Sequence, residues 1–262
     1  MLLRWFRRRR IHRTPFPPGW RVLLDRHMRF WSTLTADEQG RMEDELRFFI
    51  AERNWEGCNG LVLTESMQAI IAAQACRLLL GRPEDRFGNV STILVYPSGY
   101  VAGPPQTSTL PGGRVQVLAG AGMPVLGQAH ERGPVILSWS HTLAGAIHDQ
   151  DGNNLVLHEF AHKLDMANGA IDGTPRMSSA KQAREWHEAM TTARQRLVHD
   201  LQIGLNVPLR PYALTNPGEF FAVATEVFFE RPGAMQEWDA ELYRVMAEWY
   251  RQDPVGRDEW MA

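Results

Sequence analysis

The sequence predicts an α+β fold that is mostly helical, with a small mixed sheet directly before a metal-binding helix. Three observations predict it. Apolar residues recur at helical spacing between residues 20 and 80, and β-rich segments follow between residues 91 and 139. A further apolar helical segment then carries the pentapeptide HEFAH at residues 158–162. Because apolar periodicity distinguishes helices from strands, this order indicates a helical part at residues 20–90 and a catalytic part at residues 91–262.

Length and composition indicate an ordinary globular protein. The chain has 262 residues, of which 44% are hydrophobic and 22% are charged, which is sufficient for a sizeable core. A net charge of −2 argues against direct binding of nucleic acid. The two cysteines, Cys58 and Cys76, form no C-x-x-C pattern and fit a reducing cytoplasm. No stretch approaches the roughly 20 apolar residues that a membrane span needs.

Residues 1–19 are predicted to form a basic tail and a turn-rich linker ahead of one domain at residues 20–262. Six arginines lie between Met1 and Arg13. No apolar run of about 7–15 residues follows them, so the segment does not match a secretory signal. We expect a solvated tail whose charge would allow weak contact with an anionic membrane surface.

The helices of the first part are indicated by caps and breakers. Residues 20–31 repeat apolar side chains at spacings of three and four. Thr35, followed by acidic residues, has the pattern of a helix start, and that helix is expected to continue to about Arg53. Thr64 begins a further helix, which Gly81 ends.

The predicted sheet consists of segments rich in β-branched residues, separated by glycine and proline. These segments are residues 92–96, 115–118 and 135–139. The last one precedes the HEFAH helix most closely, and as an edge strand it would pair with an extended peptide substrate. The alternative interpretation is a strand of the core. The candidate substrate contacts on it are Val135, Leu137 and Trp139. Helices are then expected at about residues 154–167, 180–200, 216–230 and 235–250.

The HEFAH pentapeptide predicts a zinc hydrolase. Positions i and i+4 of a helix share one face, so His158 and His162 can reach one zinc ion at roughly 2.0–2.1 Å. Glu159 is the expected general base, because it faces a zinc-bound water instead of the metal. Two histidines and a glutamate on one buried helix would be energetically costly without a metal.

The third zinc ligand must come from a later segment. The pattern H-E-x-x-H-x-x-G-x-x-H is excluded, because its last histidine is Asn168 here and its glycine is Asp165. Glu219 and Glu226 are the candidates, and their spacing of seven places them on one helix face. We favour Glu219 as the ligand, because the first turn of a helix favours negative charge.

We then interpret Glu226 as the hydrogen-bond acceptor for the imidazole of a zinc-binding histidine. The alternative is that Glu226 is an ordinary solvated glutamate. Asp165 lies on the same helix face as His158, two turns further on. It could orient an imidazole, as carboxylates commonly do at such sites, or it could contact a nearby lysine or arginine.

Two segments carry a resemblance to a known family. Residues 158–165, HEFAHKLD, and residues 212–222, YALTNPGEFFA, resemble the Mlc titration factor A family of bacterial zinc peptidases. The Tyr-to-Glu spacing of seven also resembles the catalytic domain of anthrax lethal factor. The resemblance implies a zincin-like fold, cytoplasmic aminopeptidase-like activity and binding to a repressor of the Mlc type. It implies Zn²⁺ ligands His158, His162 and Glu219, the base Glu159 and the oxyanion-stabilising phenol of Tyr212.

The sequence therefore predicts a zinc-dependent peptidase with one Zn²⁺ per chain. The main alternative is a regulatory binding protein that sequesters a transcription factor and carries a latent zinc site. A third interpretation is a zinc hydrolase that acts on a non-peptide amide, and the predicted edge strand favours peptides over such substrates.

Overall fold

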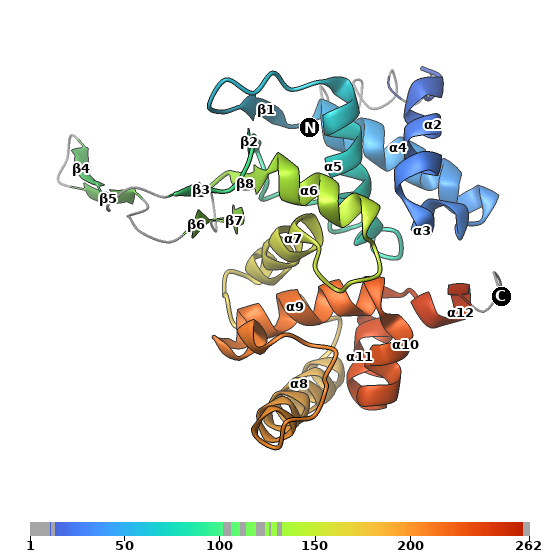
Figure 1. Cartoon of the computed structure of the whole chain (residues 1–262), viewed down its shortest axis with the longest axis vertical. Coiled ribbons are helices and arrows are strands. Elements are labelled where there is room, and N and C mark those ends of the chain that lie inside the picture. The colour runs from blue at the N-terminus through green and yellow to red at the C-terminus, as the bar shows by residue number, and fades with distance from the viewer. Residues whose placement is uncertain are drawn as a thin grey trace.

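A computed structural model describes residues 11, 14–101, 106–110, 114–118, 124–125, 127–129 and 133–258. The arginine-rich tail predicted at the N-terminus lies almost entirely outside the described residues. Figure 1 shows the N-terminal helices and the main sheet on one side of the molecule and the C-terminal helices on the other. Helices α7 (Leu155–Asp165) and α9 (Pro217–Glu230) lie between these two groups and pack against each other.

The first helical group follows the predicted caps. The Thr35 hydroxyl accepts the backbone N–H of Glu38, and the Glu38 carboxylate accepts the backbone N–H of Thr35, which together form a capping box. The Thr64 hydroxyl likewise accepts the backbone N–H of Met67. The helices of this group are α2 (Pro18–His27), α3 (Arg29–Ser32), α4 (Ala36–Ala51) and α5 (Glu65–Arg77).

The main sheet is mixed, as predicted, with strand order β1-β2-β8-β7. Strands β1 (Asn54–Gly57), β2 (Thr92–Tyr96) and β8 (Val135–Ser138) are parallel, and β7 (Gly127–Ala129) pairs with β8 in the antiparallel direction. Strand β1 falls inside the part that was predicted to be helical. The predicted strand at residues 115–118 lies in β5 (Arg114–Leu118), which pairs with β4 (Gln106–Leu110) in a separate hairpin. Strands β3 (Tyr100–Val101) and β6 (Pro124–Val125) form another short antiparallel pair.

The prediction of a substrate-binding edge strand at residues 135–139 was wrong. Strand β8 is hydrogen-bonded to β2 on one side and to β7 on the other, so neither of its edges is free. Val135 and Leu137 are fully buried in the core. Trp139 is not in the strand at all, because it begins helix α6 (Trp139–Ile147). Among the described strands, β7 is the outer strand on this side of the main sheet.

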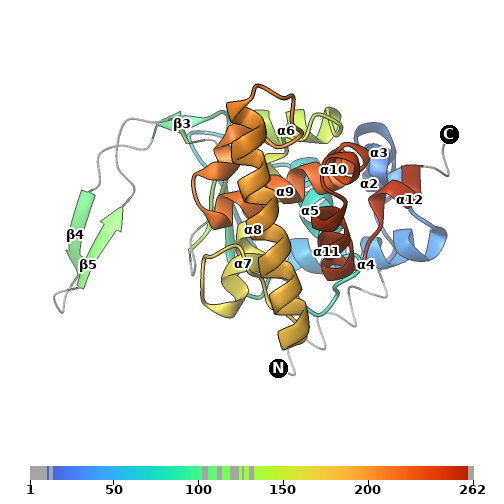
Figure 2. The same ribbon diagram turned by 90° about the horizontal axis from the view of Figure 1, so that it is seen from below.

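The C-terminal helices surround α9. In Figure 2, α8 (Ala180–Gln202) crosses the face turned toward the viewer, and it packs against α11 (Ala240–Tyr250). The single helix predicted for residues 235–250 is divided into two. Asp239 accepts the backbone N–H of Leu242 and caps α11, so the chain bends after α10 (Pro232–Trp238). The last described helix is α12 (Pro254–Asp258), and short 3₁₀ turns are η1 (Met166–Asn168) and η2 (Pro211–Leu214).

Aromatic packing holds α7 in the centre of the molecule. The Phe160 ring lies 5.5 Å from the Phe49 ring of α4 and 4.7 Å from the Phe87 ring, measured between centroids. Aromatic pairs at these distances add to the stabilisation gained from apolar burial. Every residue of α7 from Val156 to Asp165 is buried. A helix enclosed in this way gives its polar side chains fixed positions.

The capping box of α4 supplies a stability prediction. Arg257 of α12 donates two hydrogen bonds to the Glu38 carboxylate, at 2.6 and 2.9 Å. We expect Glu38→Gln to lower the free energy of unfolding by about 1 kcal/mol at neutral pH, because it removes the charge that Arg257 pairs with, although a glutamine oxygen can still accept the backbone N–H of Thr35. Urea unfolding of both proteins measures this difference.

The effect of Glu38→Gln should depend on pH. The hydrogen bonds from Arg257 hold the pKa of Glu38 at about 2, below its ordinary value of 4.5, although burial acts in the opposite direction. Because the pKa is lower in the folded state, this stabilisation is present above pH 4.5 and is lost as the pH falls toward 2. The gap between the two proteins should therefore shrink below pH 4.5. An undiminished gap at pH 3 would contradict this assignment.

Candidate metal centre

Helix α7 fixes two histidines on one face. The Asn154 side chain accepts the backbone N–H of Leu157 at 3.0 Å and begins the helix one turn before His158. His158 and His162 are four residues apart and largely buried, with 7% and 9% of their surface exposed. Their rings meet edge to face, with centroids 4.8 Å apart. The i, i+4 spacing therefore brings both imidazoles to one place.

Glu219 completes a triangle of ligand atoms with these histidines. Its Oε2 lies 3.0 Å from Nε2 of His158 and 3.5 Å from Nε2 of His162, and the two nitrogens are 3.2 Å apart. Tetrahedral ligands at roughly 2.0–2.1 Å from one zinc ion are separated by roughly 3.3 Å. The three edges of the triangle match that spacing. Within the part of the chain that the structure describes, His158, His162 and Glu219 form a group that could hold a metal ion.

The hydrogen-bond pattern at the triangle also fits a cation. The Nδ1 atom of His158 lies 2.7 Å from the Glu226 carboxylate, so it carries the proton and leaves the Nε2 lone pair free to bind a metal. Oε2 of Glu219 is buried and faces Nε2 of His158 and Nε2 of His162. A buried carboxylate oxygen beside two imidazole nitrogens is favourable when a positive charge, from a proton or a metal ion, lies between them.

The pKa values in the cluster show the same preference for positive charge. Burial by itself would lower the pKa of His158, but hydrogen bonds to Glu219 and Glu226 outweigh it and raise the pKa to about 10. Burial would raise the pKa of Glu219, but hydrogen bonds from His158 and His162 hold it far below its ordinary value. The protein environment therefore stabilises a cation at the triangle.

Glu226 lies where the sequence analysis placed it, behind His158. It is fully buried and accepts two hydrogen bonds from Arg210, at 2.6 and 3.1 Å, and one from the backbone N–H of Asn154 at 2.6 Å. The alternative of a solvated glutamate is therefore wrong. Arg210 was not found from the sequence. The available signal was an arginine next to the proline that precedes Tyr212, but its partner Glu226 lies 16 residues away.

In the described part of the chain, no hydrogen bond joins Asp165 to a histidine imidazole, although His162 influences the pKa of Asp165. Its Oδ2 accepts the backbone N–H of Gly173 at 2.9 Å and fixes the loop after α7. Its Oδ1 and Nδ1 of His162 are both buried without a hydrogen-bond partner among the described residues. Burial raises the pKa of Asp165 to about 6. The structure thus shows a loop-fixing role for this carboxylate, in place of the predicted contact with an imidazole.

Glu159 and Tyr212 lie beside the triangle. Burial raises the pKa of Glu159 to about 7, against the influence of His158 and His162. The Tyr212 ring is half exposed, and its centroid lies 6.1 Å from that of His158. Burial and the nearby Glu219 carboxylate, to which its hydroxyl is hydrogen-bonded, raise the pKa of Tyr212, so the phenol keeps its proton at neutral pH.

The fold is mostly helical with a small mixed sheet, and the histidines of the buried HEFAH helix meet a glutamate of a later helix. This combination is consistent with a metallopeptidase. Residues 3–251 match the family described as glucose-regulated metallo-peptidase M90, and the chain belongs to this family. The membership confirms the resemblance inferred from residues 158–165 and 212–222. In the described part of the chain, no helix combines the length and apolar character needed to cross a membrane.

Several relatives cover most of the chain. An uncharacterized protein of Synechocystis sp. strain PCC 6803 is 33% identical over 251 residues, which is 95% of this chain and 90% of the relative. Mlc titration factor A of Yersinia pestis strain Pestoides F is 31% identical over 234 residues, or 86% of this chain and 81% of the relative. The protein of the same name in Yersinia pseudotuberculosis strain IP 31758 gives the same values.

Proposed function

We propose that this protein is a zinc-dependent peptidase of the cytoplasm that hydrolyses peptide bonds with aminopeptidase-like activity. The observation that carries the proposal is the triangle of His158, His162 and Glu219, whose edges match a tetrahedral zinc site. Family membership supports a metallopeptidase. Two nitrogen ligands and one carboxylate leave the fourth position open, which is typical of catalytic zinc and not of structural zinc.

The residues around the triangle suit the steps of hydrolysis. His158, His162 and Glu219 would hold a zinc ion, which would supply Lewis acidity at the substrate carbonyl and lower the pKa of a water molecule. Glu159 would accept a proton as the water oxygen bonds to the carbonyl carbon, and would pass it to the amine nitrogen as the C–N bond breaks. Tyr212 keeps its phenolic proton and donates a hydrogen bond to the oxyanion that develops at the substrate carbonyl. One such donor contributes roughly 3–4 kcal/mol in the transition state.

Glu226 and Arg210 support this site without contacting substrate. Glu226 fixes the ring orientation and tautomer of His158, and Arg210 neutralises the charge of Glu226 in the buried interior. Asp165 fixes the loop that follows the metal-binding helix. These contacts hold one face of the triangle rigid, while the half-exposed Tyr212 lies on the side that a substrate can approach.

Removal of the metal tests the proposed function. Treatment with a strong chelator should abolish hydrolysis of a panel of chromogenic aminopeptides, and one equivalent of Zn²⁺ should restore it. Addition of Mg²⁺ should not, because the two histidine nitrogens suit zinc and not magnesium. A chelated protein that is free of metal by elemental analysis and still cleaves the panel would refute a metal-dependent mechanism.

The name of the Yersinia relatives favours a second role, the binding of a repressor of the Mlc type. We propose that this role is independent of peptide cleavage. Immobilised Glu159→Gln protein should then capture a purified Mlc-type repressor as well as the wild type does. Absence of capture by both proteins would remove this second role and leave the peptidase proposal untouched.

A further inference from the structure

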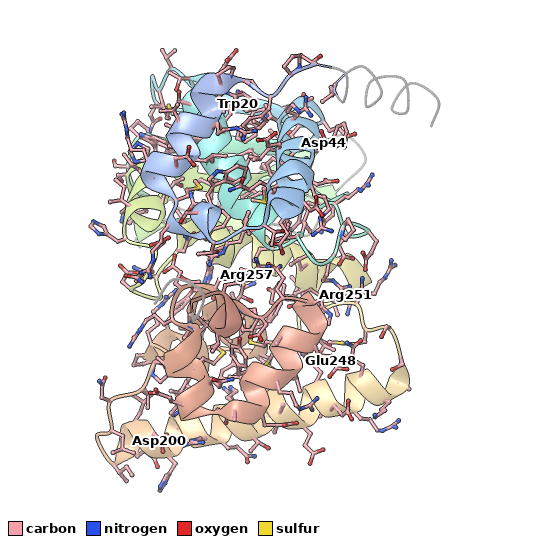
Figure 3. The ribbon with its side chains drawn as sticks, turned by 90° about the vertical axis from the view of Figure 1, so that its right-hand side faces the viewer. Trp20, Asp44, Asp200, Glu248, Arg251 and Arg257 are labelled. Atoms are coloured by element: carbon pink, nitrogen blue, oxygen red, sulfur yellow. The ribbon has the colours of Figure 1, made fainter. Side chains whose placement is uncertain are left out.

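A separate cavity of about 650 Å³ lies between α4, the turn after α5, and the segment that joins α11 to α12. Three residues that line it are labelled in Figure 3, where Asp44 of α4 lies above Arg251 and Arg257. None of the residues of the metal centre lines the cavity. Its volume falls within the range of small-molecule binding sites, about 300–1,000 Å³.

The walls of the cavity are held by tertiary packing. On one side, Glu38, Glu45 and Phe48 recur at helical spacing and form one face of α4. On the other side, the turn at Gly81 approaches the end of α11 so closely that a Cβ atom there would lie 2.3 Å from the Tyr250 carbonyl oxygen. The cavity is therefore bounded by segments that come from opposite ends of the chain.

Two hydrogen bonds fix the turn against the end of α11. Arg82 donates to the Trp249 carbonyl at 2.8 Å, and the side chain of Gln252 donates to the Arg77 carbonyl at 3.0 Å. Both are side chain to backbone bonds between groups that are buried or partly buried. They hold the second wall together, and the hydrogen bonds from Arg257 to Glu38 join that wall's C-terminal segment to α4, so the cavity is a built part of the fold.

The floor of the cavity is apolar. Met42, Cys76 and Leu79 line it and are buried, with at most 2% of their surface exposed. Phe48 and Leu80 are half-buried at its sides. An aliphatic or aromatic body placed here would gain roughly 25 cal/mol for each Å² of apolar surface removed from water.

The polar groups at the cavity leave an excess of positive charge. Four arginines and three acidic residues line it. Each acidic residue already lies beside a guanidinium, and the pairs are Glu38 with Arg257, Asp44 with Arg47, and Glu45 with Arg86.

Arg41 and Arg251 carry the remaining charge. Arg41 has no ion-pair partner among the described residues, and Arg251 pairs with Glu84 in an exposed contact, which contributes little. Arg251 also has left-handed backbone geometry, with φ of 52°, where glycine is favoured. An arginine at this position places a guanidinium at the cavity in spite of that preference.

We propose that the cavity binds a small organic anion, with its apolar body on the floor and its acidic group paired to Arg41 and Arg251. Guanidinium groups form strong charge-assisted hydrogen bonds with carboxylate, sulfonate and phosphate oxygens. The proposal concerns a site distinct from the metal centre and does not depend on peptidase activity.

Two fluorescent probes of the same shape test the proposal. Anilinonaphthalene sulfonate is an apolar anion, and phenylnaphthylamine is the same body without the sulfonate. The variants Arg41→Gln and Arg251→Gly should each raise the dissociation constant of the sulfonate probe about tenfold and leave that of the neutral probe nearly unchanged. Arg251→Gly should do so without loss of thermal stability, because glycine suits the left-handed geometry.

Controls separate the cavity from the rest of the surface. Arg184→Gln, an exposed position on α8, should bind both probes as the wild type does. Leu80→Trp should narrow the cavity and weaken both probes, with the melting temperature as the check on folding. Wild-type affinity for the sulfonate probe in both Arg41→Gln and Arg251→Gly would overturn the proposal. Equal weakening of both probes by these two variants would also overturn it.

Discussion

Glu159→Gln is expected to lower kcat/KM for peptide hydrolysis about a thousandfold, while the protein still binds one equivalent of zinc. The substitution keeps the size of the side chain but removes the group that accepts a proton from water, and general acid–base catalysis contributes about 10²–10⁴-fold. Glu159 is not one of the three converging ligands, so the metal should remain. Kinetics on a chromogenic peptide and elemental analysis of the same sample measure both quantities.

A matched variant controls for non-specific effects of losing one carboxylate. Glu188 is exposed on α8, and Glu188→Gln should keep wild-type kinetics and zinc content. If Glu159→Gln retained wild-type activity, the assignment of the general base would be wrong. If Glu159→Gln lost zinc together with activity, the Glu159 carboxylate would instead be needed for binding the metal.

Glu219→Ala is expected to lose zinc at chelator concentrations that leave the wild type loaded. The variant removes one of three protein ligands, and the two remaining nitrogens cannot hold the ion alone. Loss of a group that only orients a ligand costs about 10–100-fold in metal affinity, so Glu226→Ala should weaken zinc binding less than Glu219→Ala does. Competition with a chromogenic chelator ranks the two variants.

The Glu226 position needs a conservative variant as well. Glu226 is fully buried beside Arg210, and removing one partner of a buried pair costs about 3–5 kcal/mol of stability. Glu226→Gln keeps the packing and therefore separates an effect on zinc from an effect on folding. Stronger zinc loss in Glu226→Gln than in a folded Glu219→Ala would show that the ligand was assigned to the wrong glutamate.

Local signals in the sequence predicted much of the fold. Thr35 and Thr64 each precede a helix and cap it in the structure, because a side-chain oxygen at that position satisfies a free backbone N–H. The i, i+4 spacing of His158 and His162 is equally local. The triangle with Glu219 followed from the number of ligands that catalytic zinc needs, together with the helix dipole.

Features that depend on remote partners could not be read from the sequence. Strand β1 has four residues, too few to show a periodicity, and it exists because β2 pairs with it. The short apolar run of β8 does not show which strands pair with it, so its pairing with β7 could not be predicted. The role of Arg210 depends on its ion pair with Glu226, which only the fold brings beside it.

X-ray absorption at the zinc edge, recorded on the purified zinc-loaded protein, tests the central claim most directly, because it reports the atoms around the metal. We expect one zinc per chain with two imidazole nitrogens and carboxylate oxygen at roughly 2.0–2.1 Å. The imidazole signal should be absent when both His158 and His162 are replaced. A zinc ion surrounded only by oxygen, or an imidazole signal that survives this double substitution, would contradict the proposed metal centre.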